Sequence, residues 1–236
     1  MHNQLYILID ILIIAAYNNI MSIFKKIHND INAILSSDPA ATSRLEVILT
    51  YSGFHALFLY RIANFFHTRR YRLLARMISQ FARFMTGIEI HPGATIGSGV
   101  FIDHGSGVVI GETAEIGDNV TIYQGVTLGG TGKERGKRHP TIEDGVMLSA
   151  GAKILGSFKV GKNAKIGAGS VVLEEVPANS TVVGIPGHIV KVDGERIHDL
   201  DHSLPNPVAD ELLKLNEQML ALTERLANLE NKKIKK

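Results

Sequence analysis

A branched aliphatic residue recurs every six positions between Ile90 and Val172, and this repeat constrains the fold more than any other feature of the sequence. The repeat runs through Ile90, Ile96, Ile102, Ile110, Ile116, Ile122, Leu128, Ile142, Leu148, Ile154, Val160, Ile166 and Val172. Helices and ordinary strands have shorter periods, of about 3.6 and 2 residues. Hexapeptide repeats are typical of parallel β-helices, in which three hexapeptides form a triangular coil and stacked coils bury a continuous aliphatic column.

Two interruptions of the repeat indicate where a function can be attached. Ile102 and Ile110 are eight residues apart, and Leu128 and Ile142 are fourteen apart, so each gap adds two residues to a multiple of six. We expect the second gap to extrude a loop over residues 129–140. Coils stacked at about 4.8 Å leave no interior space for a ligand, so a site must lie outside, where loops commonly carry function. A non-catalytic scaffold is the alternative that the repeat alone leaves open.

Helical patterns precede the repeat. Ser22 can cap a helix that ends before Ser36, and Ser43 and Glu46 have the spacing of a capping box for a helix that reaches about Phe66. A break is expected at Gly53. The first helix has an apolar stripe at Phe24, Ile27, Ile31 and Ile34. A third helix, ending near Gly87, has a stripe at Leu74, Met77, Ile78, Phe81, Phe84 and Met85.

These patterns predict an α+β chain with four segments. Residues 1–20 are an apolar N-terminal extension, without function or, alternatively, a membrane-associated tail, and residues 21–87 form a separate helical bundle that caps the β-helix. Residues 88–190 form the β-helix domain. Residues 191–236 form a tail in which a heptad seam predicts a helix. The seam comprises Leu212, Leu215, Met219, Leu222, Leu226 and Leu229.

Composition excludes several classes of function. The formal net charge of +2 gives no bulk electrostatic reason for binding nucleic acid. The absence of cysteine excludes disulfides, thiolate catalysis and zinc–thiolate sites, and it fits a cytoplasmic protein. The apolar run from Leu5 to Tyr17 is too short to span a bilayer, so we expect no membrane partner.

Three short segments place reactive side chains on the repeat: Glu89 to Pro92, Asp103 to Gly107, and Arg138 to Pro140. Because one coil takes eighteen residues, the position stacked on Glu89 is expected near residue 107. Glu89 and His104 should therefore lie near one edge of the prism, as a carboxylate that raises the basicity of an imidazole.

A zinc site is the rival interpretation of the histidines, since left-handed β-helix carbonic anhydrases use three. His91, His104 and His139 share no local ligand spacing, however. We therefore expect no metal.

Several motifs occur in an order that resembles serine O-acetyltransferases. They are Asp38-Pro39-Ala40, Ser52-Gly53-Phe54-His55-Ala56, Thr86 to Ala94, Asp103-His104-Gly105, Val126 to Lys133, Arg138-His139-Pro140 and Gly184-Ile185-Pro186-Gly187. The resemblance covers about residues 22 to 190. It implies an N-terminal helical domain followed by a left-handed parallel β-helix, which is an exception to the right-handed crossover rule.

The resemblance also implies a chemistry, the acetylation of the L-serine hydroxyl by acetyl-CoA in the first step of cysteine biosynthesis. His104 matches the general base and Glu89 its acidic partner. The matches to residues that hold the amino acid are Asp38, Asp103, Arg138 and His139. Acetyl-CoA, a co-substrate rather than a bound cofactor, is expected near Ala150, Ala168 and Lys165. The alternatives are another hydroxyl acceptor such as a sugar, a metal-dependent hydratase and a scaffold.

The resemblance further implies a homotrimer and feedback inhibition by L-cysteine. In many relatives a C-terminal isoleucine inserts into O-acetylserine sulfhydrylase, whereas this chain ends with Lys235 and Lys236. That ending argues against the complex. The short helical domain argues against the hexamer of longer relatives.

Overall fold

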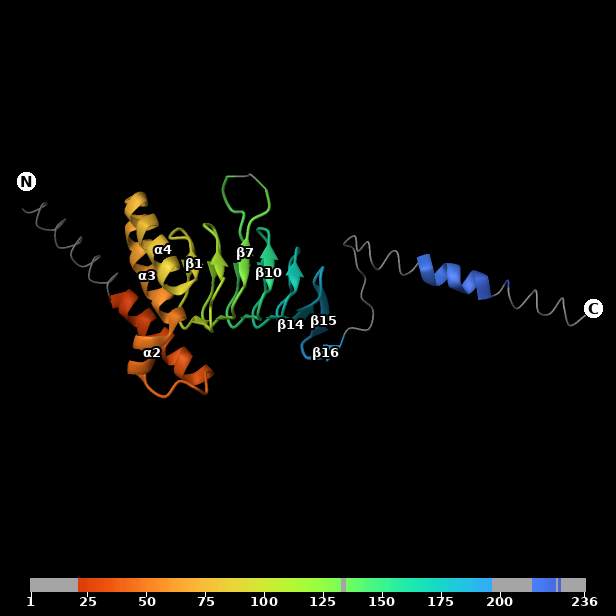
Figure 1. Cartoon of the computed structure of the whole chain (residues 1–236), viewed down its shortest axis with the longest axis horizontal. Helices are drawn as coiled ribbons and strands as arrows, with labels where there is room; N and C mark the ends of the chain where they lie inside the picture. Colours follow the sequence, from red (N-terminus) through yellow and green to blue (C-terminus); the bar gives the residue numbers. More distant parts are fainter. Residues whose placement is uncertain (1–20, 133–134, 197–213, 224, 226–236) are drawn as a thin grey trace, which may run out of the picture. The chain divides into compact units, whose positions relative to one another are not determined.

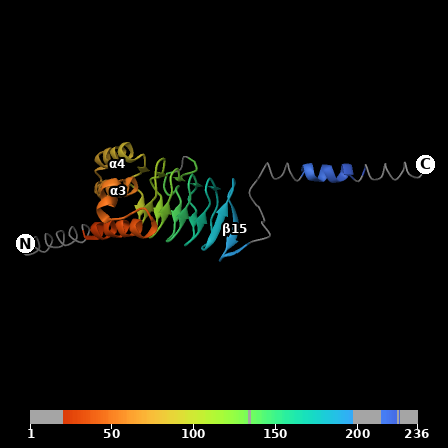
Figure 2. The same ribbon diagram turned by 60° about the horizontal axis from the view of Figure 1, so that its bottom comes forward.

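The computed structural model describes residues 21–132, 135–196, 214–223 and 225. The chain divides into two compact units, residues 1–200 and 201–236. In the first unit, helices are followed by short strands stacked one coil on the next (Figures 1 and 2). The predicted α+β architecture, with N-terminal helices and a left-handed parallel β-helix, is confirmed.

The strands form the three faces of the prism. The first sheet contains β1 (Glu89–Ile90), β4 (Val109–Ile110), β7 (Thr127–Gly129), β10 (Lys153–Leu155) and β13 (Val171–Val172). The second contains β2 (Thr95–Ile96), β5 (Glu115–Ile116), β8 (Thr141–Ile142) and β11 (Lys159–Val160). The third contains β3 (Phe101–Ile102), β6 (Thr121–Ile122), β9 (Met147–Leu148), β12 (Lys165–Ile166), β14 (Ser180–Val183), β15 (His188–Val192) and β16 (Glu195–Arg196).

The aliphatic repeat forms the core of this prism. Each of its residues lies in a strand, and none is more than 4% exposed. All strands up to β14 pair in parallel, and β15 and β16 close the third sheet as antiparallel strands. The hexapeptide period therefore predicted both the strands and their buried side.

The predicted register of Glu89 is wrong by two residues. Glu89 pairs with Val109, not with position 107. The turn between β3 and β4 is longer than the other turns at that edge, because it contains the two additional residues of the first interruption. After β7 the chain leaves the coil again and returns at β8, and the intervening segment projects from the prism (Figure 1).

Residues 21–37 are helical, followed by α2 (Arg44–Thr50), α3 (Ser52–Thr68) and α4 (Arg72–Thr86). The first helix thus ends at Ser37, slightly later than predicted. At the start of α2, the Ser43 hydroxyl accepts a hydrogen bond from the Glu46 amide at 3.2 Å. The Glu46 carboxylate accepts from the Thr42 amide at 2.9 Å, and the Ser43 amide also contributes to the lowered pKa of Glu46. The predicted capping box is therefore extended by one residue toward the N-terminus.

The predicted break at Gly53 is also misplaced. The helices separate at Tyr51, and Gly53 lies inside α3. A Cβ atom on Gly53 would lie 2.0 Å from the carbonyl oxygen of Ile102. Glycine is required here because α3 packs directly on the backbone of β3.

Helix α3 closes the end of the β-helix. Leu57 and Tyr60 are buried in the same core as the first residues of the aliphatic column. The Tyr60 hydroxyl donates to the Ala94 carbonyl at 2.6 Å. Helix α3 therefore caps the β-helix and shares its core, whereas the first helix and α2 contribute Ile31, Ile34 and Val47 to a second cluster that includes Phe54 and Phe101.

A buried ion pair fixes the first helix to this assembly. Asp30 accepts hydrogen bonds from Arg61 and, at 2.9 Å, from the Gly99 amide. Arg61 also donates to the Gly97 carbonyl at 3.2 Å. Both side chains are at most 4% exposed. Breaking such a pair leaves an uncompensated buried charge, which is strongly destabilising.

The predicted apolar stripe of α4 is not buried. The side of α4 that packs inward carries Ala75, Ser79 and Ala82. Five of the six residues of the predicted stripe are exposed, from 42% at Leu74 to 84% at Phe84, and Ile78 is half-buried. The prediction that α4 ends at Gly87 is confirmed, since this residue adopts the left-handed conformation with a φ of 70°.

The second unit is described only over residues 214–223 and 225. Residues 214–223 are helical, and Leu215, Met219 and Leu222 of the heptad seam are exposed. Leu212, Leu226 and Leu229 lie outside the described residues, as does the extension 1–20. Among the described helices, none has the length and apolar character needed to cross a membrane.

Candidate active site

Two edges of the prism carry the residues that the sequence singled out. The His104 edge comprises the turns from the third sheet to the first, at 103–108, 123–126, 149–152 and 167–170. The Arg138 edge comprises the connections from the first sheet to the second, at 91–94, 111–114 and 130–140. Most of the predicted site residues divide between these two edges, whereas Asp38, Glu89 and Lys165 lie next to them.

His104 projects from the longer turn after β3. Its φ of 56° is left-handed, and its carbonyl accepts from the Ser52 hydroxyl at 3.1 Å. The imidazole is 77% exposed, and its Nε2 lies 3.9 Å from Oδ1 of Asp103. The backbone is thus held by α3 while the ring points outward, accessible to a substrate.

Asp38 lies close to the His104 edge, on the connector after the first helix. It accepts hydrogen bonds from the Ala40 amide and the Tyr51 hydroxyl, both at 2.8 Å. The Ala40 amide foremost, and then Tyr51, hold the pKa of Asp38 below its usual value. Burial, together with the neighbouring carboxylates, raises the pKa of Tyr51 to about 12. Asp38 is therefore an ionised carboxylate that a neutral phenol holds in place.

Glu89 has a different neighbour from the one predicted. Its carboxylate pairs with Nη1 of Arg83, at the end of α4, at 3.1 Å. Within the part of the chain that the structure describes, no hydrogen bond or ion pair joins Glu89 to His104. Asp103 is the carboxylate that the structure places beside the imidazole.

A column of glycines continues the His104 edge toward β13. Gly107, Gly125, Gly151 and Gly169 have φ between 68° and 75°. A Cβ atom on Gly125 would lie 3.4 Å from Cα of Gly151. Because side chains are absent, this edge presents a strip of bare backbone, flanked by Ala150 and the exposed Ala168. Such a strip can accommodate an extended ligand.

Three lysines at six-residue spacing lie on three different sheets, as the period predicts: Lys153 on β10, Lys159 on β11 and Lys165 on β12. Lys153 donates to the Gly125 carbonyl, and Lys159 pairs with Glu143 at 3.6 Å. Among the described residues Lys165 has no such partner, and it is exposed. It also lies directly before the turn that contains Ala168.

Arg138 and His139 lie on the other edge, where the extruded segment returns. Arg138 donates to the Glu112 carboxylate at 2.5 Å, and this hydrogen bond lowers the pKa of Glu112. Thr113 accepts at its hydroxyl from the backbone amides of Arg138 and His139, at 3.0 and 3.2 Å. Thr113 therefore positions both residues, and no sequence pattern pointed to it.

The ring of His139 packs against backbone. A Cβ atom on Gly111 would lie 2.1 Å from its Nε2. Its Nδ1 accepts from the Thr113 amide at 3.2 Å, so the neutral ring carries its proton on Nε2. Burial lowers the pKa of His139. His139 is therefore a neutral hydrogen-bond donor.

His91 begins the same edge on the first coil. Its Nδ1 accepts from the Gly93 amide at 3.0 Å, and its ring centroid is 6.0 Å from that of His67. Burial, with a further contribution from Arg76, lowers the pKa of His91 to about 4. The three histidines of the zinc interpretation thus lie on two edges, His104 on one and His91 and His139 on the other.

The fold and the exposed histidine beside a bare backbone edge define the class of hexapeptide-repeat transferases. Residues 139–174 match the model for the bacterial transferase hexapeptide (six repeats). Residues 4–58 match the model for the serine acetyltransferase N-terminal domain, so most of segment 1–20 aligns with that domain.

Relatives and solved structures narrow this class. A serine acetyltransferase from Bacillus pumilus is 59% identical over 211 residues, 89% of this chain and 97% of that protein. One from Staphylococcus aureus is 58% identical over 201 residues, 84% of this chain and 94% of that protein. The chain belongs to the serine acetyltransferase family.

Two solved structures share the fold. That of Neisseria gonorrhoeae serine acetyltransferase in complex with serine is 44% identical, with a TM-score of 0.71 over 72% of this chain and 70% of that one. A serine acetyltransferase in complex with cysteine is 46% identical, with a TM-score of 0.73 over 76% of this chain and 70% of that one.

Proposed function

We propose that this enzyme, an acyltransferase, transfers the acetyl group of acetyl-CoA to the hydroxyl of L-serine, giving O-acetyl-L-serine and CoA. The observation that supports it most is the placement of His104, exposed at the head of a bare backbone edge and flanked by Asp38 and Asp103. An imidazole can accept the hydroxyl proton. The carboxylates can hold the serine ammonium, and the backbone edge can receive an extended thioester.

The charges of the two edges match the two ends of serine. Asp38 and Asp103 bind the ammonium group. Arg138 binds the carboxylate through its planar fork, which suits two parallel hydrogen bonds. His139 donates a further hydrogen bond from Nε2. Because Arg138 is paired with Glu112 in the structure, the substrate carboxylate shares or replaces that partner.

In the chemical step, His104 removes the proton from the serine hydroxyl as its oxygen attacks the thioester carbon. The new C–O bond forms a tetrahedral intermediate, which collapses by breaking the C–S bond. The imidazolium then returns its proton to the sulfur of CoA. The attack is direct, so no acyl-enzyme forms.

An acidic partner stabilises the imidazolium during this step. The sequence resemblance assigns that role to Glu89, whereas Asp103 is the carboxylate found near Nε2. Glu89 can act only if its carboxylate turns from Arg83 toward His104. Glu89 is the proposed partner, and Asp103 is the alternative.

Acetyl-CoA lies along the glycine column, past Ala150 and Ala168, with Lys165 placed to meet a phosphate. This orientation puts the acetyl group near His104 and the nucleotide end near the last coil. It also explains why the column lacks side chains over four successive turns.

The active enzyme is a homotrimer in which neighbouring chains complete the site. His104 and Arg138 lie on different edges of one prism, so a serine bound by both must contact a second copy. Cyclic assembly of three prisms brings one edge of each copy against a different edge of the next. The cytoplasm remains the predicted location.

L-cysteine competes for the same site, because it shares the ammonium and carboxylate of serine. The solved relative in complex with cysteine is consistent with this. High serine should relieve the inhibition.

An assay of CoA release tests the proposed function. Release should require L-serine, and no sugar acceptor should replace it. Chelation of divalent metals should leave the rate unchanged. Release with a sugar but not with L-serine would contradict the proposal.

A further inference from the structure

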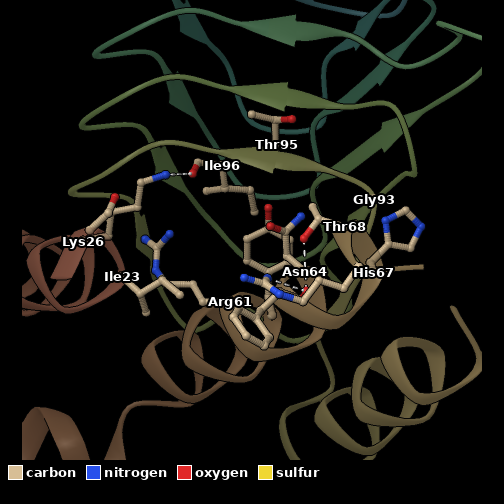
Figure 3. Close-up of a pocket in the computed structure, with 13 residues that line it drawn as sticks. Ile23, Lys26, Arg61, Asn64, His67, Thr68, Gly93, Thr95 and Ile96 are labelled. Atoms are coloured by element: carbon tan, nitrogen blue, oxygen red, sulfur yellow. Dashed lines mark hydrogen bonds between the residues drawn. The ribbon is translucent and has the colours of Figure 1, made fainter. Parts of the chain in front are cut away.

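A pocket of about 660 Å³ lies between the helix 21–37, α3 and the first coil, and its lining includes Gly93 of the Arg138 edge but none of the proposed site residues. Figure 3 shows Lys26 on one side of it, Arg61, Asn64 and His67 on α3, and Thr95 and Ile96 on the coil. The volume lies within the range of about 300–1,000 Å³ that is typical of small-molecule sites.

The lining of this pocket is basic. It includes Lys26, Arg61, His67 and Arg69, and none of the described residues that line it is acidic. The positive charge of Arg61 is already matched by Asp30, which lies behind it. Within the described part of the chain, no ion pair involves Lys26 or Arg69. Two cations of the lining thus lack a direct ion-pair partner among the described residues, although the charges of Asp118 and Asp30 act on Lys26 from further away.

Both cations are held in place. Lys26 donates from Nζ to the Ile96 carbonyl at 3.1 Å (Figure 3). Arg69 lies with Cζ 3.5 Å from the centroid of the Phe65 ring, and it donates to the Phe65 carbonyl at 3.1 Å. A fixed cation loses less conformational entropy when it binds a ligand than a mobile one does.

Burial, together with the charge of Arg61, lowers the pKa of Lys26. A bound anion would oppose this shift, because its negative charge favours the protonated form of Lys26. The pocket also has an apolar side, formed by Ile23, Phe65 and Ile96.

We propose that this pocket binds a small organic anion, whose phosphate or carboxylate group is held between Lys26 and Arg69 and whose body lies against Phe65 and Ile23. The site is separate from the one that binds serine and acetyl-CoA, and it does not depend on the proposed function.

Equilibrium dialysis of the full chain against radiolabelled inorganic phosphate tests the site, with acetate as a competing carboxylate. We expect saturable binding of one phosphate per chain. Lys26→Gln and Arg69→Gln should each weaken it about tenfold, since each removes a hydrogen bond from a charged group. Displacement by acetate would show that carboxylates also bind, and its absence would restrict the site to phosphates.

Neighbouring residues provide matched controls. Lys25→Gln and Arg70→Gln remove the same charges next to the pocket, where neither side chain lines it, and should preserve binding. Lys26→Arg and Arg69→Lys keep the charge and should retain most of the affinity. The proposal is overturned if no saturable binding occurs, if the controls weaken it equally, or if Arg138→Gln abolishes it instead.

Discussion

The two edges of the prism differ in how they hold their functional side chains. On the His104 edge the imidazole is 77% exposed, and the rest of the edge is bare backbone. On the Arg138 edge the residues are tied together by hydrogen bonds to Thr113 and Glu112, and His139 is only 9% exposed. The first edge suits proton transfer and a long ligand, whereas the second suits the recognition of a carboxylate. Neither edge alone contains all of the proposed site residues.

The largest effect is expected at the His104 edge. His104→Ala should lower kcat by a factor of about 10² to 10⁴, the usual contribution of a positioned general base. Folding should survive because the ring is exposed. Steady-state kinetics, with His28→Ala as an exposed control, measures the change. The base and its acidic partner act as a unit, so a further substitution of the partner should lower kcat little beyond the effect of His104→Ala alone.

Glu89→Gln and Asp103→Asn, each measured alone and combined with His104→Ala, therefore identify the partner. The partner is the carboxylate whose substitution lowers kcat in the parent but not in His104→Ala.

A smaller effect, mainly on substrate affinity, is expected at the Arg138 edge. Arg138→Gln should raise KM for serine by a factor of about 10 to 100, since it removes charge-assisted hydrogen bonds to the carboxylate. KM for acetyl-CoA should change little. Arg138→Lys should recover only part of the loss, because lysine lacks the planar fork. An unchanged KM for serine would show that the Arg138 edge does not bind the serine carboxylate.

The glycine column predicts a further difference between edges. Ala168→Trp should raise KM for acetyl-CoA about tenfold by filling the backbone strip, since loss of one or two contacts has that scale. Ala178→Trp introduces the same exposed side chain after β13, away from this strip, and should leave KM unchanged. Equal effects of the two variants on KM would show that the glycine column does not bind acetyl-CoA.

The smallest effect concerns stability at the Arg138 edge. The pKa of His91 is lowered to about 4, so between the ordinary value and pH 4 the unfolded chain binds the proton and the folded chain does not. The contribution of His91 to the free energy of unfolding is therefore fully present above about pH 6.5 and is lost as the pH falls toward 4. The melting temperature of His91→Gln should therefore decline less between pH 7 and 4 than that of the parent. Parallel pH profiles would contradict the depressed pKa.

The sequence predicted the fold correctly where the apolar side chains are buried by other parts of the same chain. Each strand of the prism packs on the next coil, so the aliphatic period and the buried positions coincide. The stripe of α4 shows the opposite case. Its periodicity correctly gave a helix, but Phe84 is 84% exposed, because Ala75 and Ala82 form the side that packs inward. Periodicity identifies the apolar face and does not say whether the same chain covers it.

The candidate site was predicted only in part for similar reasons. Motifs indicated Asp103, His104, Arg138 and His139, but the coil length used for Glu89 ignored the extra residues in the turn after β3. Tyr51 and Thr113 were missed because their roles depend on tertiary contacts with Asp38 and His139. The Gly53 error has the same origin, since only the approach of Ile102 explains why glycine is needed inside a helix.

Co-expression of His104→Ala and Arg138→Gln chains in one cell tests most directly whether the two edges combine between copies. Each variant alone has a defect in every site. In mixed trimers, about one in three of the sites would pair an intact His104 edge with an intact Arg138 edge from the neighbouring chain. Purified mixed oligomers, selected by two different tags, should therefore recover a substantial part of the parent activity. Mixed oligomers as inactive as the separate variants would show that one chain supplies both edges of its own site.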